Sequence, residues 1–344
     1  MNKEKPTVVV AMSGGVDSSA VAYLLKKENY NVVGATMKLL NNEATTNAIN
    51  DAKKVCEVLG IKHYVFDMEK EFKEIVITNF INSYKEGKTP NPCVVCNKKF
   101  KFGLFYKKAK ELLNADYIAT GHYASLKDNK LVESQNTAKD QSYFLWGINK
   151  NVLPHIMFPL SKYENKDEVR HEVSKILPNT SKKKDSQEIC FIPNDDYKAF
   201  LSKYTTTKPG NIYLEDNTLI GKHAGLTNYT VGQRKGLNIS YKEPLFVLRI
   251  DTKNNCLIVG PKESLYKDKL RANNINILVD DFSGKILAKI RSHGPKEEVV
   301  IEKDQDELIV TFKNKVRAIT PGQSIVFYHE DGTCLGGAII KEAL

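Results

Sequence analysis

The sequence predicts an α/β protein with a doubly wound parallel-sheet domain, then a small central domain and a C-terminal β-barrel. Two observations predict this class. In the first part of the chain, short apolar runs alternate with stretches of helical periodicity, which is typical of βαβ units. Beyond residue 200 the pattern changes to strand-length segments separated by Gly, Pro, Asp or Asn, which indicates a small barrel or sandwich. A chain of 344 residues has room for more than one domain.

The first strand and helix set the pattern for the parallel sheet. The run TVVVAM (7–12) is apolar throughout, as in a parallel strand that is buried on both faces. After a Gly-Gly turn, apolar residues such as Val21 and Leu25 share one face of a helix over 17–30. The rhythm continues with strands at 31–37, 63–68 and 115–124 and with helices at 44–59, which Gly60 ends, and 72–87.

The second part of the chain begins after a polar, turn-rich stretch, TTTKPGNIY (205–213). Residues 244–261 predict a β-hairpin that turns at Lys253–Asn255. Further strands are expected at 285–292, 297–303, 307–313, 324–330 and 335–340. We therefore expect three domains, with limits at 1–200, 201–268 and 269–344.

Net charge, apolar runs and cysteine count limit the classes of protein to which this chain can belong, but they do not identify its function. The net charge of +10 favours a polyanionic partner, because cations that neutralise phosphates release counterions, but a lysine-rich solvated surface explains it equally well. The apolar run near the N-terminus is too short for a signal peptide, and no stretch approaches the roughly 20 apolar residues of a membrane helix. We expect a cytoplasmic protein without a membrane partner. Six cysteines in such a chain indicate metal ligands or catalytic thiols rather than a disulfide scaffold.

The stretch AMSGGVDSSA (11–20) lies where the first strand meets the first helix. Gly14 and Gly15 allow a sharp turn and a close approach of the backbone to a ligand. Exposed N–H groups and the positive end of a helix bind phosphate well at such a place. The lysine of a P-loop is absent. An ordinary helix cap by Asp17 or Ser18 is the alternative, and the position directly after a buried strand makes it the weaker one.

The residues SGGVDSS (13–19) resemble the PP-loop of the N-type ATP pyrophosphatases, which share the adenine nucleotide alpha hydrolase-like fold. The resemblance implies cleavage of ATP between its α- and β-phosphates and adenylation of a carbonyl or carboxylate oxygen. It implies the class of reaction but not the substrate.

Five further stretches, in order along the chain, together resemble one family. That family is the tRNA-specific 2-thiouridylases (the MnmA/TrmU family), and the resemblance runs from the N-terminus to beyond residue 330. Five spaced motifs are far more specific than one short motif. They are GKTPNPCVVCNKKFKFG (87–103), ADYIATGHYA (115–124), KDQSYFL (139–145), KKKDSQEICFI (182–192) and YTVGQRKGL (229–237).

The resemblance implies a tRNA-uridine 2-sulfurtransferase that uses ATP with Mg²⁺. ATP adenylates the C2 oxygen of the wobble uridine (position 34), and a cysteine persulfide then delivers sulfur, giving s2U34, AMP and PPi. By position, Cys190 matches the persulfide carrier and Cys96 the nucleophile. Breaking the remaining S–S bond needs a second thiolate, so a disulfide bond is implied. The implied partners are Lys, Glu and Gln tRNAs and a sulfur-donor protein, either a cysteine desulfurase or a sulfur relay. We expect a monomer.

The resemblance also implies the binding residues. Asn91, Pro92, Cys93 and His122 match positions near the target base, which must leave its stack to react. The positions that match ATP contacts are Ala11, Met12, Ser13, Gly14, Gly15, Val16, Asp17, Ser18, Met37 and Gly121. The positions that match tRNA contacts are Lys139, Asp140, Gln141, Arg234, Lys235, Arg291, Ser292 and Gln323. Taken alone, Lys139–Gln141 predict only a polar helix start, and Arg234 and Lys235 only a glycine-flanked turn.

Cys93 leaves a second mechanism open. Some family members have an aspartate there, and this chain instead forms Cys93-x-x-Cys96 in a proline-braced turn. With Cys190 these thiols suffice for a [4Fe–4S] cluster with one open iron, whereas the persulfide route needs no metal. A zinc site lacks a fourth ligand, apart from a speculative His122. Flanking lysines at 98, 99, 101 and 182–184 favour thiolate over thiol.

Two other function classes remain as alternatives. A PP-loop ligase acting on a small molecule, as argininosuccinate synthetases do, needs neither the cysteines nor a basic barrel, so thiol alkylation would leave it active. A non-catalytic iron–sulfur RNA-binding protein would bind tRNA without releasing AMP. The paired thiols argue against the first alternative and the intact ATP loop against the second.

Overall fold

The computed structural model describes residues 5–182, 189–206 and 208–344. The chain forms two compact units. Unit 1 contains Met1–Ile75, Cys93–Gln187 and Gly332–Cys334, and unit 2 contains Val76–Pro92, Glu188–Asp331 and Leu335–Leu344. Over the described ranges, no helix combines the length and the apolar character that crossing a membrane requires.

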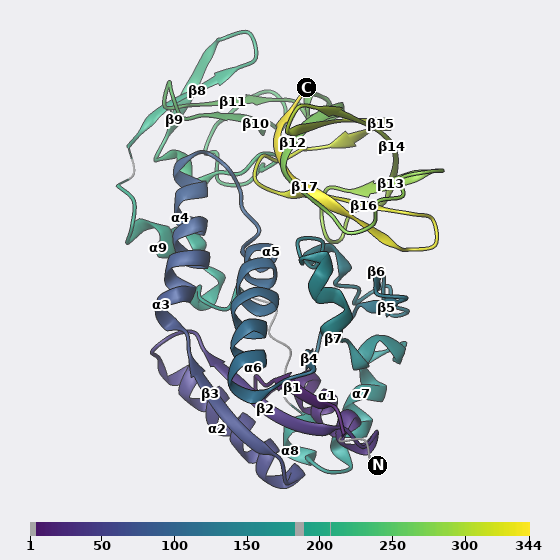
Figure 1. Cartoon of the computed structure of the whole chain (residues 1–344). Coiled ribbons are helices and arrows are strands. Elements are labelled where there is room, and N and C mark those ends of the chain that lie inside the picture. Colours follow the sequence, from purple (N-terminus) through teal and green to yellow (C-terminus); the bar gives the residue numbers. More distant parts are fainter. Residues whose placement is uncertain (1–4, 183–188, 207) are drawn as a thin grey trace. The chain divides into compact units, whose positions relative to one another are not determined.

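Unit 1 is built on a parallel sheet of five strands in the order β3-β2-β1-β4-β7 (Figure 1). The order places β1 between β2 and β4, so the chain winds outward in both directions from β1, as the alternating pattern predicts. The strands are β1 (Thr7–Ala11), β2 (Asn31–Lys38), β3 (Lys62–Asp67), β4 (Tyr117–Ala119) and β7 (Ile156–Met157).

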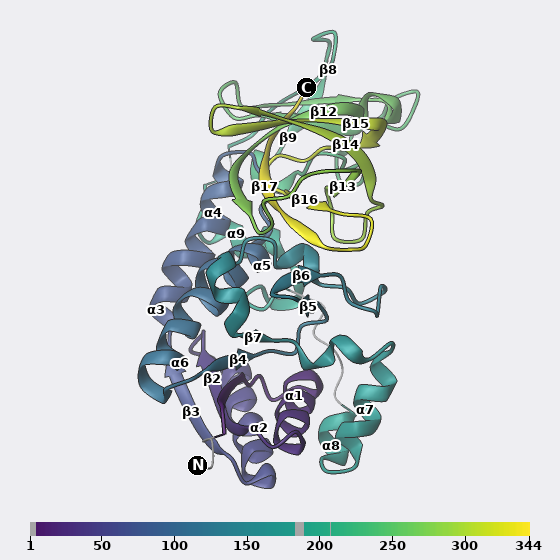
Figure 2. The same ribbon diagram turned by 45° about the vertical axis from the view of Figure 1, so that its right-hand side comes forward.

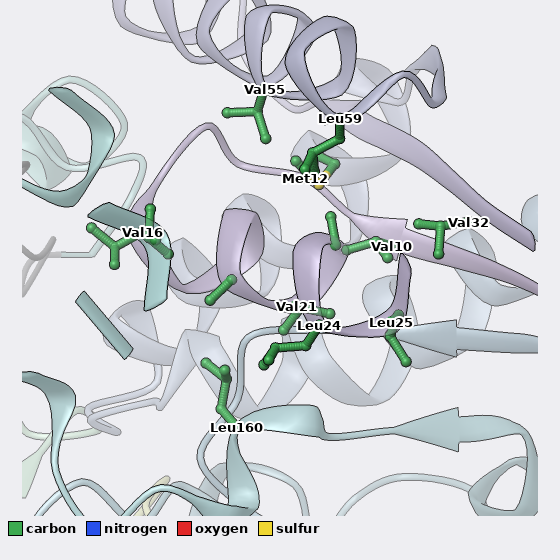
Figure 3. Packing of buried hydrophobic residues seen from close by; sticks show 14 of the residues in the cluster. Val10, Met12, Val16, Val21, Leu24, Leu25, Val32, Val55, Leu59 and Leu160 are labelled. Atoms are coloured by element: carbon green, nitrogen blue, oxygen red, sulfur yellow. The ribbon is translucent and has the colours of Figure 1, made fainter. Parts of the chain in front are cut away.

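One face of the sheet is covered by α1 (Val16–Lys27), α2 (Glu43–Leu59) and α7 (Lys166–Ser174). Val21 and Leu24 of α1 pack beside Leu160 in this core (Figure 3). The α2 helix has both of its predicted ends. The Asn42 side chain accepts a hydrogen bond from the Thr45 amide (2.8 Å), and Gly60 ends the helix in the left-handed conformation (φ 60°).

The opposite face is covered by a continuous helix over residues 92–113, where the sequence predicted only a proline-braced turn at the cysteines. It consists of α5 (Pro92–Val95), the π-helical segment η2 (Cys96–Phe105) and α6 (Tyr106–Leu113). Proline suits the first turn of a helix because its missing N–H has no partner there. Phe105 contacts Phe66 of the sheet, with ring centroids 5.8 Å apart. This packing makes the stretch helical, so the prediction of a turn was wrong.

The shorter elements and the second long helix complete the first half of the chain. The helix predicted at 72–87 is a run of α3 (Glu69–Phe72), the π-helical η1 (Lys73–Ile77) and α4 (Thr78–Lys85). The others are β5 (Ser125–Lys127), β6 (Lys130–Val132), η3 (Ser142–Phe144), η4 (Lys150–His155), η5 (Pro159–Lys162) and α8 (Pro178–Ser181).

Unit 2 contains a four-stranded sheet in the order β10-β11-β8-β9. The predicted hairpin is confirmed, since β10 and β11 pair antiparallel and Asn255 takes a positive φ of 49° at the turn. The sheet encloses a small core around Ile212, Val247 and Leu257. Its elements are η6 (Pro193–Asp195), α9 (Tyr197–Ser202), β8 (Gly210–Leu214), β9 (Leu219–His223), η7 (Leu226–Asn228), β10 (Phe246–Asp251) and β11 (Cys256–Gly260).

The C-terminal part of unit 2 is a closed barrel in the order β12-β15-β14-β13-β16-β17 (Figure 2). The predicted fold class is therefore confirmed. The sequence missed β12, whose residues YKDKLRANNINI lack apolar alternation and whose pairing shifts register beside both of its neighbours. The elements are η8 (Lys262–Leu265), β12 (Tyr266–Ile277), β13 (Ile286–Lys289), β14 (Glu297–Asp304), β15 (Glu307–Arg317), β16 (Ser324–Tyr328) and β17 (Cys334–Ala343).

Candidate nucleotide, thiol and RNA-binding residues

The predicted ATP residues meet at the carboxyl edge of the parallel sheet. Residues 11–18 follow β1, Met37 lies near the end of β2, and Gly121 follows β4. Because β1 pairs in parallel with both β2 and β4, the three strand ends lie next to one another. This edge, at the point where the strand order reverses, is where open α/β sheets bind ligands.

The loop after β1 has a backbone that only glycine permits at one position. Gly14 has a φ of +69°, and a Cβ there would lie 2.7 Å from the Ala48 carbonyl oxygen. Gly15 is the residue before α1, and among the described residues no side chain caps the helix, so the alternative of a cap by Asp17 or Ser18 was wrong. The Ser18 hydroxyl instead accepts a hydrogen bond from the Ser13 amide (3.2 Å). The start of α1 therefore presents backbone N–H groups of the kind that bind phosphate.

Two of the predicted ATP residues have side chains that are buried in the core of unit 1. Met12 and Val16 have side chains that are 2% and 4% exposed and belong to the core (Figure 3). The Met12 amide donates to the Ala35 carbonyl (2.9 Å), which continues the pairing of β1 with β2. Their side chains thus fix the loop on the sheet.

Gly121 brings the end of β4 against the loop. A Cβ on Gly121 would lie 2.8 Å from the Asp17 Cβ, so a larger residue would separate the two segments. The Tyr123 hydroxyl donates to Asp17 Oδ1 (3.1 Å), and Lys166 Nζ donates to Asp17 Oδ2 (2.9 Å). The Asp17 carboxylate therefore joins the loop to β4 and to the first residue of α7.

The two thiols of the cysteine motif lie in the first turns of the helix 92–113. The Cys96 side chain is buried and Cys93 is exposed. Burial raises the pKa of the Cys96 thiol, and Lys101 opposes the rise without cancelling it. The protein around Cys93 raises the pKa of that thiol in the same way, again against Lys101. Lys101 therefore favours the thiolate at both cysteines, as expected, but loss of water outweighs it, and both thiol pKa values are raised.

The other lysines near the motif have different positions. Lys98 lies over the Trp146 ring (5.6 Å to the centroid), and Lys99 and Lys182 are exposed. Lys183 and Lys184 lie outside the described residues. Only Lys101, among the three lysines that follow Cys96, acts on the pKa of both thiols.

His122 is held as a neutral ring. Its Nδ1 is 2.7 Å from the Thr120 hydroxyl, and its ring packs near Phe102 and Phe158, with centroids 5.8 and 6.1 Å away. Loss of water around the ring lowers the pKa of His122 well below its usual value, and Lys101 lowers it further.

Cys190 belongs to unit 2, whereas Cys93 and Cys96 belong to unit 1. The Cys190 side chain is exposed, and the next residue, Phe191, packs against Phe80 and Phe200. Within residues 5–182, 189–206 and 208–344, no group of three or more His, Cys, Asp or Glu side chains is placed to hold a metal ion.

The triplet Lys139, Asp140 and Gln141 braces a loop of unit 1, immediately before η3 rather than inside a longer helix. The Asp140 carboxylate accepts from the Ser142 hydroxyl (2.7 Å), and Gln141 Oε1 accepts from the Tyr123 amide (3.0 Å). Lys139 is the exposed member of the three. Two of these residues therefore hold the chain that follows β4, and one presents a cation to solvent.

Unit 2 brings Arg291 and Gln323 to the same open pocket of about 300 Å³. Arg291 Nη2 donates to the Ala318 carbonyl (2.7 Å), and Gln323 Nε2 donates to the Thr89 carbonyl (2.8 Å). Gly232 lines the pocket close to Ala318, where a Cβ would meet the alanine methyl at 2.9 Å. The lining contains two arginines and no acidic residue: Thr89, Thr230, Val231, Gly232, Arg291, Arg317, Ala318, Thr320 and Gln323.

The remaining predicted contacts of unit 2 do not line this pocket. Arg234 and Lys235 are exposed in the expected turn, between Gly232 (φ 89°) and Gly236 (φ 82°). Ser292 Oγ is 3.0 Å from His293 Nδ1. Asn91 is half-buried and Pro92 is buried.

Comparison with known proteins places the whole chain in one family. Three family models match in order: the tRNA methyl transferase HUP domain over residues 6–194, the tRNA methyl transferase PRC-barrel domain over 198–261, and the aminomethyltransferase beta-barrel domain over 267–340. A tRNA-specific 2-thiouridylase MnmA 1 of Fusobacterium nucleatum is 46% identical, over 99% of this chain and 95% of that protein. The chain belongs to the tRNA-specific 2-thiouridylase family.

A second 2-thiouridylase, MnmA of Halothermothrix orenii, is 43% identical over 97% of this chain and 99% of its own length. Among solved structures, the U34-tRNA thiolase NcsA of Methanococcus maripaludis with its [4Fe-4S] cluster shows 23% identity and a TM-score of 0.37, covering 59% of this chain and 66% of that chain. The family models and the two 2-thiouridylase relatives confirm the family resemblance predicted from the five sequence stretches.

Three residues near the candidate sites were not predicted from the sequence and are identified only by the structure. Tyr123 and Lys166 contact Asp17, and Arg317 lines the pocket with its guanidinium 5.6 Å from the Phe246 centroid. A local signal does exist for the helix that starts at Lys166, because Asn165 and Glu168 form a capping pattern. Nothing in the sequence indicates which loop that helix would face.

Proposed function

We propose that this protein is an ATP-dependent tRNA-uridine 2-sulfurtransferase that converts the wobble uridine to 2-thiouridine. The observation that carries the proposal is membership of the 2-thiouridylase family over the full chain, together with an uncapped helix start at the carboxyl edge of the sheet. These relatives favour neither of the two alternative functions, the small-molecule ligase and the non-catalytic RNA-binding protein.

ATP would bind as its magnesium complex, and the bound ion would supply positive charge for the departing pyrophosphate. The N–H groups of Gly15–Ser18 at the start of α1 bind the phosphates, and Met37 and Gly121 border the nucleotide. The uridine O2 attacks the α-phosphorus, and pyrophosphate leaves with the bonding electrons. The C2 oxygen is a poor leaving group by itself. In the resulting adenylate it can leave as part of AMP.

Sulfur transfer follows in two displacements. The terminal sulfur of a Cys190 persulfide attacks C2, and AMP leaves with the former O2. The Cys96 thiolate then attacks the Cys190 sulfur, which breaks the bond to the transferred sulfur and forms a Cys96–Cys190 disulfide. The product is 2-thiouridine, and an external thiol reductant restores the two cysteines. The raised pKa of Cys96 means that it must lose its proton for this step.

We further propose how tRNA is recognised. Asn91, Pro92, Cys93 and His122 border the flipped target base. The phosphate backbone contacts Lys139, Asp140 and Gln141, the turn with Arg234 and Lys235, and the pocket that contains Arg291 and Gln323, with Ser292 beside it. Two arginines in a lining without carboxylates support a phosphate at the pocket. The proposed substrates are Lys, Glu and Gln tRNAs. A cysteine desulfurase or a sulfur relay supplies the persulfide sulfur. The protein acts as a cytoplasmic monomer, and its three domains have limits at 1–200, 201–268 and 269–344.

The test measures iron, acid-labile sulfide, AMP and 2-thiouridine together, for wild type purified without oxygen and for the Cys93→Ala variant. The persulfide route predicts no stoichiometric iron and activity that depends on Cys96 and Cys190 but survives Cys93→Ala. About four irons per chain that disappear in Cys93→Ala would replace it with a [4Fe–4S] route. Absence of 2-thiouridine, despite active ATP cleavage with a persulfide donor, would overturn the proposed function itself.

A further inference from the structure

A lysine lies beside the nucleotide loop although the loop motif contains none. Lys166 Nζ is 2.9 Å from Asp17 Oδ2, and the two side chains are 14% and 31% exposed. Lys166 is 149 residues along the chain from Asp17 and begins α7, which packs with α1 in the same core. A cation is thus placed at the part of the loop where the sequence shows no P-loop lysine.

The position of Lys166 is electrostatically unfavourable for α7 alone. The first turn of a helix carries partial positive charge, so acidic side chains are favoured there and ammonium groups are not. The α7 helix follows this rule with Asp167 and Glu168, and the Asn165 side chain caps the Glu168 amide (3.0 Å). Lys166 is the exception, and a partly exposed ion pair contributes little to stability. Its place is better explained by a role at the loop.

Asp17 holds that ammonium in a fixed place. Its carboxylate accepts from the Tyr123 hydroxyl with one oxygen and from Lys166 with the other. Its Cβ is set against the backbone of Gly121, where a methyl group would approach to 2.8 Å. An ammonium has three N–H donors, so one group can bond both Asp17 and a phosphate oxygen. A carboxylate beside a phosphate site would repel the phosphate. Asp17 is compatible with such a site because it holds the Lys166 ammonium there.

We propose that Lys166 binds the β- and γ-phosphates of ATP, the part that leaves as pyrophosphate, and that Asp17 and Tyr123 are its positioning residues. This inference rests on the proposed use of ATP. Lysine is a point charge suited to phosphate, and charge that builds on a leaving pyrophosphate is stabilised by a nearby cation. Lys166 thereby takes the role of the P-loop lysine from a distant part of the chain.

The experiment compares the affinities for ATP and AMP of the whole protein without tRNA, by calorimetry with magnesium present. AMP lacks the two phosphates that Lys166 contacts. Lys166→Met should weaken ATP binding about tenfold or more, the scale of a lost hydrogen bond to a charged group, and leave AMP affinity nearly unchanged. Lys166→Arg should recover most of the loss because it keeps the charge.

Lys162→Met is the matched control. Lys162 precedes α7 by four residues and also pairs with a carboxylate, Glu28 (3.1 Å), away from the loop. Its ATP and AMP affinities should match those of the wild type. Equal losses for ATP and AMP in Lys166→Met, or no loss for either, would overturn the inference. The binding experiment contains no tRNA, so its result does not depend on thiolation. If the wild type failed to thiolate tRNA but Lys166→Met still lost affinity for ATP and not for AMP, the proposed function would fail and this inference would stand.

Discussion

At the cysteine motif, loss of water around the thiols and the charge of Lys101 shift the thiol pKa values in opposite directions, and loss of water has the larger effect. Both Cys93 and Cys96 have raised pKa values although Lys101 lies near enough to lower them. The thiol form therefore dominates at neutral pH, which limits premature reaction with oxidants or disulfides. The same lysine lowers the pKa of His122, so one cation acts on three proposed site residues.

Removing that cation gives a prediction at the residue scale. Lys101→Met should raise the pKa of Cys96 further and shift the pH dependence of its alkylation by iodoacetamide to higher pH. Mass spectrometry of the Cys96 peptide measures the rate. Lys99→Met, an exposed lysine two residues earlier, is the control and should keep the wild-type profile. An unchanged profile in Lys101→Met would show that Lys101 does not act on the thiol.

His122 gives a second prediction through its lowered pKa. The pKa of the unfolded residue is about 6.5, and the folded value lies well below it. The neutral ring therefore contributes stability that is fully present above about pH 6.5 and is lost as the pH falls through the lowered pKa. In NMR spectra, the ring signals of His122, assigned with His122→Gln, should keep their neutral positions from about pH 8 to 6.5. Titration within that range would contradict the desolvated environment.

Among the elements, the loop between β1 and α1 depends on one glycine far more than on its neighbour. Gly14 has a positive φ and no room for a methyl group, whereas Gly15 has a φ of −91° and only an ordinary 3.5 Å contact with the Ser13 hydroxyl. The left-handed conformation alone costs a non-glycine residue roughly 1–2 kcal/mol. The clash with Ala48 adds to that cost because its partner atom belongs to the backbone.

The paired variants Gly14→Ala and Gly15→Ala test this difference. Gly14→Ala should lower the free energy of unfolding by at least about 1–2 kcal/mol and weaken ATP binding, since the loop must move. Gly15→Ala should stay close to wild type in both respects. Urea denaturation and calorimetry provide the two measurements. Equal effects of the two substitutions would argue against the loop geometry described.

At the scale of the whole molecule, the net charge is +10, and some of the cations lie together in unit 2. Arg291 and Arg317 line one pocket without carboxylates, and Arg234 and Lys235 occupy an exposed turn. Contacts of cations with phosphates release counterions, so each contributes to the salt dependence of RNA binding. We propose that these cations supply affinity for the tRNA backbone.

Arg317 supplies the prediction that belongs to this scale. Arg317→Met should weaken tRNA binding and reduce the slope of log affinity against log salt by about one, without changing ATP affinity. Filter binding at several salt concentrations measures both quantities. Arg249→Met is the control, because Arg249 is 67% exposed on β10 and pairs with Asp251. If the two variants behaved alike, the pocket would not be a phosphate site.

The sequence by itself determined the fold class, the family and the strands with apolar runs, such as β1, β2 and β3. Buried parallel strands require continuous apolar runs, and a phosphate loop requires small residues at fixed spacing, so both leave local patterns. It did not determine the helix over 92–113, because that helix is stabilised by Phe66 and other residues far away in the chain. Strand β12 was missed for a related reason: its polar residues form a strand only through pairing with β15 and β17.

Tertiary structure also decided the environments of the candidate residues. Lys166, Tyr123 and Asp17 are far apart in sequence, and only the packing of α1, α7 and the end of β4 brings them into contact. The shifted pKa values of Cys96 and His122 depend on how much water the surrounding protein removes. A sequence records which charges are near in the chain, whereas desolvation depends on every atom that packs around a group. That is why the motifs predicted the class of chemistry but not the protonation of the proposed site residues.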